Sequence, residues 1–215
     1  ALLQIGDSYD RLGEYEEALD YLGRLIQRYD FTQMSQQEII EMTTLKLKGI
    51  VKETTRELVA KAQIKRGDIY GHQGKVEKAL EAYAALPRDY SAETRLVQDS
   101  YLRAAELVHQ TRGTIPAVNA YKYAIENVEE KRFQAKTQLQ VARFLFAEKE
   151  FKKAAEEYDI YIRAYADIAE RVGFSLDKAV FRMAQSHQAQ GEKMRQSDPR
   201  KADAALGRAI ALYRQ

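Results

Sequence analysis

The three histidines are the side chains best suited to metal binding or acid–base catalysis in this sequence. They are His72, His109 and His187, and each lies in a different helical segment. A metal or catalytic centre needs its groups within a few ångström of one another, whereas packed helices lie roughly 8–10 Å apart. We therefore predict that the chain has no catalytic residue and no metal-binding residue.

Sequence motifs for phosphate binding and nucleophilic catalysis are also missing. The chain has no Gly-rich phosphate loop, no HExxH pattern and no nucleophile elbow. Adjacent carboxylates such as Glu16-Glu17 and Glu156-Glu157 point in different directions on a helix, so they indicate a solvated surface. The absence of cysteine removes thiol chemistry and says nothing of the compartment. We predict a protein that is not an enzyme and needs no cofactor.

Composition and charge set the class of protein. The 215 residues include three prolines and are rich in good helix formers, which favours an all-α fold. A formal charge of +2 is small for a chain that is 31% charged, so nucleic acid is not the expected partner. No apolar stretch approaches the roughly 20 residues of a membrane span. Because the sequence opens without Met inside an apparent helix, we interpret it as a fragment of a longer protein.

The first helical hairpin, from Leu2 to Tyr29, breaks at Leu12-Gly13-Glu14. Its spacing is carried by Ile5, Gly6, Tyr9, Gly13, Tyr15, Ala18, Leu22 and Leu25. This pattern resembles a tetratricopeptide repeat: a large-then-small pair and an aromatic in the first helix, then an aromatic after the turn and a small residue in the second helix. The resemblance implies a helix pair that stacks on similar pairs to bury its apolar faces.

Related hairpins follow along the chain. We predict repeats at about 1–30, 60–88, 97–128, 134–166 and 176–215 in a single domain spanning 1–215. Their small first-helix residues, Gly67, Ala105, Ala142 and Ala184, are spaced more widely than the family period of about 34 residues. The resemblance therefore implies an all-α, right-handed α-solenoid of about five elongated hairpins.

The segment between the first two hairpins is too long for a turn. Ser35-x-x-Glu38 is a capping-box signal, and apolar residues follow it at helical spacing. We predict either an inserted helix over about 35–56 or one long helix that runs into the next repeat. Gly49 and Thr54-Thr55 are the weak points where a helix over 35–72 would divide in two.

The elongated repeats, with an extended turn before Pro199, are similar to the bacterial envelope branch of the family. That branch includes the lipoprotein of the outer-membrane β-barrel assembly machinery and the periplasmic protein that accompanies the Tol-Pal system. Ala166 stands where those proteins usually carry a proline. The resemblance favours a periplasmic or envelope-associated location slightly over a cytoplasmic one.

The resemblance also implies a scaffold that binds a partner protein or peptide in a concave groove lined by first helices. The groove positions are Asp68, Glu106, Lys136, Leu139, Arg143, Phe146, Lys178, Phe181 and Arg182. We expect an extended or helical segment with acidic residues near Arg143 and Arg182, and with Phe146 and Phe181 as its apolar contacts. In the other interpretation, these residues are only a solvated inner face.

The sequence is compatible with two further kinds of partner. The C-terminal basic residues could bind nucleic acid or an anionic surface, but acidic residues interleave with them; the basic residues are Lys193, Arg195, Arg200, Lys201 and Arg208. Self-association could use apolar surface at the ends of the helix stack.

Overall fold

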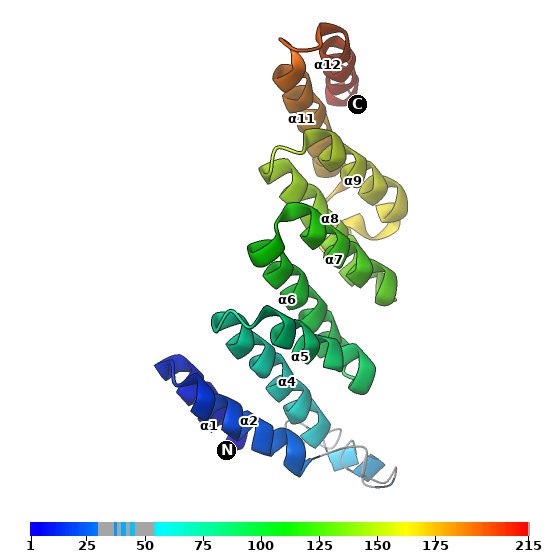
Figure 1. Cartoon of the computed structure of the whole chain (residues 1–215). Helices are drawn as coiled ribbons and strands as arrows, with labels where there is room; N and C mark the ends of the chain where they lie inside the picture. The colour runs from blue at the N-terminus through cyan, green and yellow to red at the C-terminus, as the bar shows by residue number, and fades with distance from the viewer. Residues whose placement is uncertain (30–36, 38–39, 42–43, 46–53, 215) are drawn as a thin grey trace. The chain divides into compact units, whose positions relative to one another are not determined.

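Helices make up the whole regular structure of the described residues. The structure is a computed structural model that describes residues 1–29, 37, 40–41, 44–45 and 54–214 (Figure 1). The elements are α1 (Leu2–Leu12), α2 (Tyr15–Arg28), α4 (Thr55–His72), α5 (Val76–Asp89), α6 (Thr94–Arg112), α7 (Thr114–Asn127), α8 (Lys131–Ala147), α9 (Phe151–Ala164), η2 (Ala166–Ile168), α10 (Ala169–Val172), α11 (Leu176–Met194) and α12 (Pro199–Tyr213). The predicted all-α fold of stacked helix hairpins is confirmed.

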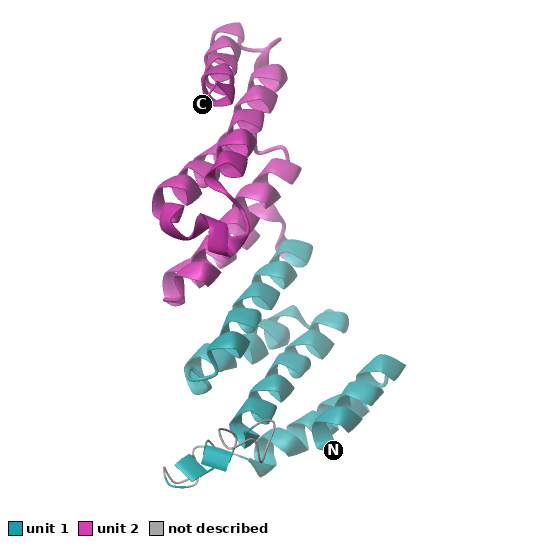
Figure 2. Ribbon diagram, turned by 180° about the vertical axis from the view of Figure 1, so that it is seen from behind, with its two compact units in different colours: residues 1–111 teal, residues 112–215 magenta. Residues whose placement is uncertain are grey.

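The chain forms two compact units, residues 1–111 and 112–215 (Figure 2). The predicted repeat at about 97–128 is divided between them. Organisation as one domain over 1–215 stays a prediction. Among the described residues, no helix combines the length and the apolar character that a membrane crossing requires.

In unit 1, small residues let the helices of each hairpin touch. A Cβ added to Gly6 would lie 2.9 Å from the Leu22 side chain, and one added to Gly67 would lie 2.4 Å from the Tyr83 ring. Ala18 and Leu22 are fully buried in the core around the first hairpin. This contact geometry explains the large-then-small pattern in the sequence, because a bulkier residue would force the two helices apart.

The boundary before α4 is set by a capping box. The N–H of Glu57 donates to the Thr54 hydroxyl at 3.2 Å, and the N–H of Thr54 donates to the Glu57 carboxylate at 3.3 Å. The backbone of Thr54 is extended, so no helix continues through it. A single helix over 35–72 is therefore wrong. Most of the predicted inserted helix at 35–56 lies outside the described residues.

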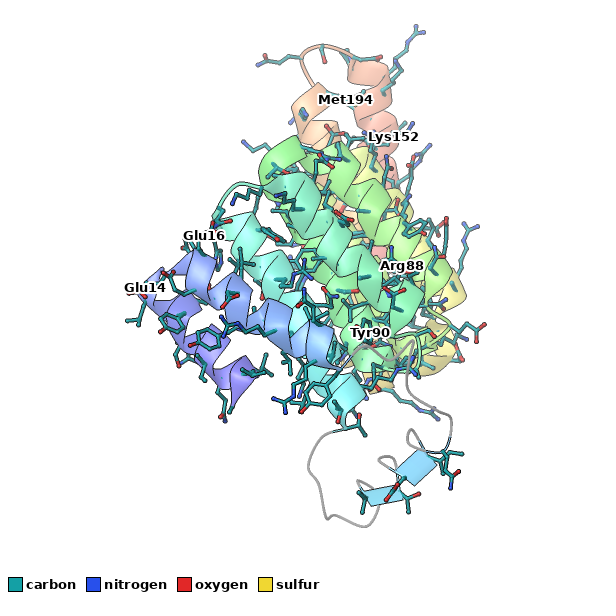
Figure 3. The ribbon with its side chains drawn as sticks, turned by 60° about the horizontal axis from the view of Figure 1, so that its bottom comes forward. Glu14, Glu16, Arg88, Tyr90, Lys152 and Met194 are labelled. Carbon is teal, nitrogen blue, oxygen red and sulfur yellow. The ribbon has the colours of Figure 1, made fainter. Side chains whose placement is uncertain are left out.

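The first and second hairpins are joined by polar contacts at their turns. Glu16 of α2, labelled in Figure 3, accepts a hydrogen bond from the Gln73 amide at 3.2 Å and pairs with Lys75 at 3.5 Å. Tyr90, labelled in the same figure after the end of α5, is buried in the unit 1 core. These contacts hold α1, α2, α4 and α5 as one stack, on which the position of the first-helix side chains depends.

In unit 2, α8 packs against α7, α9 and α10, and α11 packs against α9 and α12. Glu157 of α9 is buried and binds neighbours on both of the preceding helices. It accepts a hydrogen bond from Gln138 of α8 at 2.7 Å and pairs with Lys122 of α7 at 2.5 Å. The Tyr161 hydroxyl donates to the Phe174 carbonyl at 2.8 Å, which fixes the segment between α10 and α11 against α9.

The turns of three hairpins share one backbone geometry. A residue with left-handed φ follows the first helix, and these residues are Gly13 (77°), Gly74 (69°) and Lys149 (62°). The next N–H then donates to the carbonyl five residues back, at 2.8–3.0 Å in all three turns. Lys149 is the non-glycine member of this set, so it adopts a conformation that a side chain disfavours.

Candidate protein-binding site

Three of the predicted groove residues meet at an open hollow in unit 2. The hollow has a volume of about 500 Å³ and lies between α8 and residues 172–174, at the end of α10. Its lining consists of Lys136, Leu139, Gln140, Arg143, Phe144, Val172, Gly173 and Phe174. We call it the unit 2 hollow. The helical spacing of Lys136, Leu139 and Arg143 places them on one face of α8, as predicted.

Among the described residues, no acidic side chain pairs with the charges of the unit 2 hollow. Lys136 and Arg143 are exposed, and neither makes an ion pair with another described residue. The described lining contains no acidic side chain. Burial raises the pKa of the Tyr158 hydroxyl, and the charges of Arg182 and Arg143 both oppose that shift, so both guanidinium groups act on the same hydroxyl. The hollow therefore presents positive charge beside apolar walls.

Leu139 and Gln140 contribute walls of fixed position. Leu139 is only 6% exposed because it packs in the core with Ala142 and Tyr158, so little of its side chain can contact a partner. The Gln140 amide donates to the Tyr121 hydroxyl at 3.2 Å. Phe144 lies edge-on to the Tyr121 ring, with centroids 6.4 Å apart. These contacts keep the lining of the hollow in place.

The two predicted phenylalanine contacts do not line this hollow. Phe146 packs edge-on against Phe151 within its own hairpin, with ring centroids 5.4 Å apart. Phe181 is 51% exposed and lies against Tyr213 of α12, with centroids 5.6 Å apart. Both rings thus have partners on the second helix of their own hairpin.

Lys178 and Arg182 of α11 are exposed but also lie outside the lining of the unit 2 hollow. The Arg182 guanidinium donates to the Gln185 side chain at 2.9 Å. Their predicted role in partner binding stays a prediction.

Unit 1 has a hollow at its first helices too, of about 380 Å³. We call it the unit 1 hollow; it is lined by Leu3, Gln4, Asp7, Lys61, Ile64, Lys65, Asp68, Leu96, Asp99 and Arg103. The predicted groove residue Asp68 lies here, whereas Glu106 is exposed outside the lining and accepts a hydrogen bond from Gln110 at 3.2 Å. First helices α1, α4 and α6 all contribute to this hollow.

The charged groups of the unit 1 hollow bind one another. Arg103 donates to both carboxylate oxygens of Asp68 at 2.9 Å and to Asp99 at 2.9 Å. The Tyr83 hydroxyl donates to Asp68 at 2.8 Å, and burial followed by the Asp68 charge raises the pKa of Tyr83. Lys65 pairs with Asp7 at 2.5 Å, and its hydrogen bond holds the pKa of Asp7 below the usual value. Asp68 is thus occupied by neighbours within unit 1.

Sequence reasoning missed part of both linings. Arg103 follows Asp99 by one helical turn, which is a readable i,i+4 signal, but its bond to Asp68 crosses from α6 to α4. Gln140 and Phe144 could have been found from the spacing of Lys136 and Arg143 on α8. No sequence pattern indicates that Phe174 lines the hollow, because its position depends on how α10 packs against α8.

Two of the C-terminal basic residues bind other groups of the chain. Lys201 pairs with Asp198 at 2.8 Å, and Lys193 donates to the Lys149 carbonyl at 3.3 Å. In the described part of the chain, no group of three or more His, Cys, Asp or Glu side chains could hold a metal ion.

Comparison with known proteins relates part of the chain to a family. Residues 1–32 and 61–92 each match the family model for the tetratricopeptide repeat. These two segments are similar to tetratricopeptide repeats. They are the segments that contain α1 with α2 and α4 with α5, whose small contact residues are described above. No curated protein matches the chain.

Two solved structures are similar over nearly the whole length. One is a putative kinesin light chain from Podosopora anserina with nearly identical TPR-like repeats, 14% identical, with a TM-score of 0.49 over 99% of this chain and 93% of that chain. The other is BtubC (BKLC) from P. vanneervenii, 16% identical, with a TM-score of 0.45 over 99% of this chain and 88% of that chain.

Proposed function

We propose that the chain is a non-enzymatic protein-interaction scaffold whose unit 2 hollow binds an acidic segment of a partner protein. The observation that carries this proposal is the pair Lys136 and Arg143, which flank the hollow without an acidic partner among the described residues. Tetratricopeptide repeats generally mediate protein–protein interaction, and two segments of the chain match that family. A partner carboxylate would supply the counter-charge that is absent from the described lining of the hollow.

Charge and apolar contact would have different roles in this complex. An exposed ion pair contributes about 0.2–1 kcal/mol and weakens as salt screens it. Phe144 and Phe174 offer apolar surface, whose burial contributes about 25 cal/mol per Å². We therefore expect acidic residues to set selectivity and association rate, while apolar neighbours in the partner supply most of the affinity.

Charge reversal tests the assignment. Arg143→Glu should weaken binding of a fluorescein-labelled, glutamate-containing peptide by about fivefold or more, because attraction becomes repulsion. Arg182→Glu should have a smaller effect in the same direction. Arg195→Glu is the matched control, since Arg195 is exposed at the end of α11 and outside the hollow. Equal affinities of the Arg143→Glu and wild-type proteins, measured by fluorescence anisotropy, would show that the hollow is only a solvated surface.

The alternative partner, nucleic acid or an anionic surface, would use the C-terminal basic residues. The pairing of Lys201 with Asp198 lowers the positive charge available there. An envelope location remains part of the proposal and is supported by the elongated repeats and by the extended turn before Pro199. Adding single-stranded DNA to the anisotropy assay discriminates between the two partners, because only the alternative predicts competition that survives Arg143→Glu.

A further inference from the structure

Lys136 and Arg143, which have no ion-pair partner among the described residues, leave the α8 backbone at a defined separation. Lys136 and Arg143 are seven residues apart on α8. Seven residues make nearly two full turns, so both side chains leave the same face, and their Cα atoms lie about 10.5 Å apart along the axis. Leu139 and Gln140 lie between them and are fixed by the core and by Tyr121. A partner with two negative charges about 10 Å apart therefore matches the spacing of the two cations on α8.

The backbone of the partner decides which residues can do this. In a polyproline II segment, residues i and i+3 lie on the same side and about 9.3 Å apart. In a β-strand, residues on one face are separated by about 6.6 Å or 13 Å, which fits less well. In an α-helix, residues i and i+7 match the separation of about 10.5 Å. Extended and helical partners thus require different spacings of their acidic residues.

The walls of the hollow favour the extended partner. The lining comes from α8 and from residues 172–174, so a bound segment has to contact both. An α-helix with its side chains is about 10–12 Å wide, whereas the backbone of an extended chain occupies about 5 Å, the spacing of neighbouring strands. An extended chain therefore approaches Phe144 and Phe174 more closely than a helix does.

We propose that the unit 2 hollow recognises an extended acid-x-x-acid segment, with one carboxylate bound to Lys136 and the other to Arg143. This inference rests on the proposed function, because it specifies the sequence of the acidic partner. The two intervening side chains leave such a segment about 120° away from the acids, so that one of them would contact Phe144 or Phe174. Since Lys and Arg side chains are long and flexible, the preference for this spacing is graded, at about threefold in dissociation constant.

A series of labelled peptides tests the spacing. Each peptide carries two glutamates and one leucine in the same serine–proline background, with one, two, three or four residues between the glutamates. A fifth, alanine-rich helical peptide places glutamates at i and i+7. In fluorescence anisotropy at about 50 mM salt, the peptide with two intervening residues should bind about threefold more tightly than the others. Lys136→Ala or Arg143→Ala should weaken binding and remove the preference, whereas Arg195→Ala should keep it.

The outcomes separate the two proposals. Equal affinity for the four extended peptides would overturn the spacing and leave acidic recognition intact. Tightest binding of the helical peptide would overturn the extended partner. Absence of binding by every peptide would contradict the proposed function itself. Circular dichroism of the variants checks that each is folded, since both substitutions change exposed side chains of α8.

Discussion

The unit 1 hollow and the unit 2 hollow are built on first helices of the hairpins but treat their charges in opposite ways. The described lining in unit 1 has three acidic and three basic residues, and its Arg103 and Lys65 are bonded to Asp68, Asp99 and Asp7. The described lining in unit 2 has two basic residues and no acidic one. A cation on a first helix thus stabilises the fold where a neighbouring helix supplies a carboxylate. Otherwise it stays available to a partner.

The Tyr83 ring supports this internal pairing in unit 1, so displacing it should have the largest effect. Gly67→Ala adds a Cβ within 2.4 Å of that ring, which must then shift and lose its bond to Asp68. We expect unfolding in urea to show a loss of about 2–3 kcal/mol. Gly23→Ala is the control, because its Cβ would meet no atom within 4 Å in α2 and should stabilise by about 0.5–1 kcal/mol. Equal effects would mean that the close contact at Gly67 is readily relaxed.

Removing the two carboxylates that bind Arg103 should leave a cation available in the unit 1 hollow, as in the unit 2 hollow. In the double variant Asp68→Asn, Asp99→Asn, the guanidinium loses both charged partners, and the protein should lose about 1–2 kcal/mol of stability. The same variant should gain weak binding of glutamate peptides in unit 1, seen as a second phase in the anisotropy titration. Asp20→Asn, which breaks an exposed pair with Arg24 on α2, should change neither property. Stability loss without new binding would show that an unpaired cation alone does not make a site.

Acid should lower the stability that the ion pairs of the unit 1 hollow contribute. It should not change the contribution of the residues that line the unit 2 hollow. The pKa of Asp7 in the folded chain lies below 3.8, chiefly because Lys65 donates to it. Its stabilising effect is therefore present above about pH 4 and is lost as the pH falls through the folded pKa. Lys65→Gln should remove this part of the pH dependence when urea midpoints at pH 6 and pH 2.5 are compared with wild type. Lys136→Gln should leave the difference unchanged, since no described carboxylate lines its hollow.

Local spacing predicted the fold because the contacts that define a hairpin are close in sequence. Gly6 and Gly67 mark where two consecutive helices touch: Gly6 lies against Leu22 and Ala18, and Gly67 lies against Tyr83. Ala18 and Ala79, the predicted small residues of the second helices, are fully buried. The Thr54-x-x-Glu57 capping box was also readable and would have decided where α4 begins. Helical hairpins are therefore largely predictable from the sequence.

The binding site was less predictable because pairing between hairpins depends on packing. The bond between Asp68 and Arg103 joins residues 35 positions apart, and no local pattern indicates it. The helical period predicts Phe146 and Phe181 on the groove side. In the structure the two rings pack against Phe151 and Tyr213, respectively, on the second helices of their hairpins. Periodicity predicts the helix face on which a side chain lies, whereas the neighbours that the side chain contacts depend on the tertiary structure.

The smallest expected change in stability concerns the hairpin turns, whose left-handed residue is glycine in unit 1 and Lys149 in unit 2. Gly13 and Gly74 adopt left-handed φ without strain, but Lys149 adopts φ 62° with a side chain. A non-glycine residue costs about 1–2 kcal/mol there, and glycine loses about 0.5–1 kcal/mol through its greater freedom in the unfolded chain. Lys149→Gly should therefore raise the free energy of unfolding by about 0.5–1 kcal/mol.

Lys149→Ala separates the backbone effect from loss of the lysine side chain. Alanine keeps a Cβ, so the left-handed strain remains and stability should stay within about 0.5 kcal/mol of wild type. The bond from Lys193 to the carbonyl of residue 149 involves only backbone at that position, so both variants can retain it. If Lys149→Gly and Lys149→Ala raise the free energy of unfolding equally, the cause is removal of the lysine charge. Both variants lose that charge, whereas only glycine relieves the backbone strain.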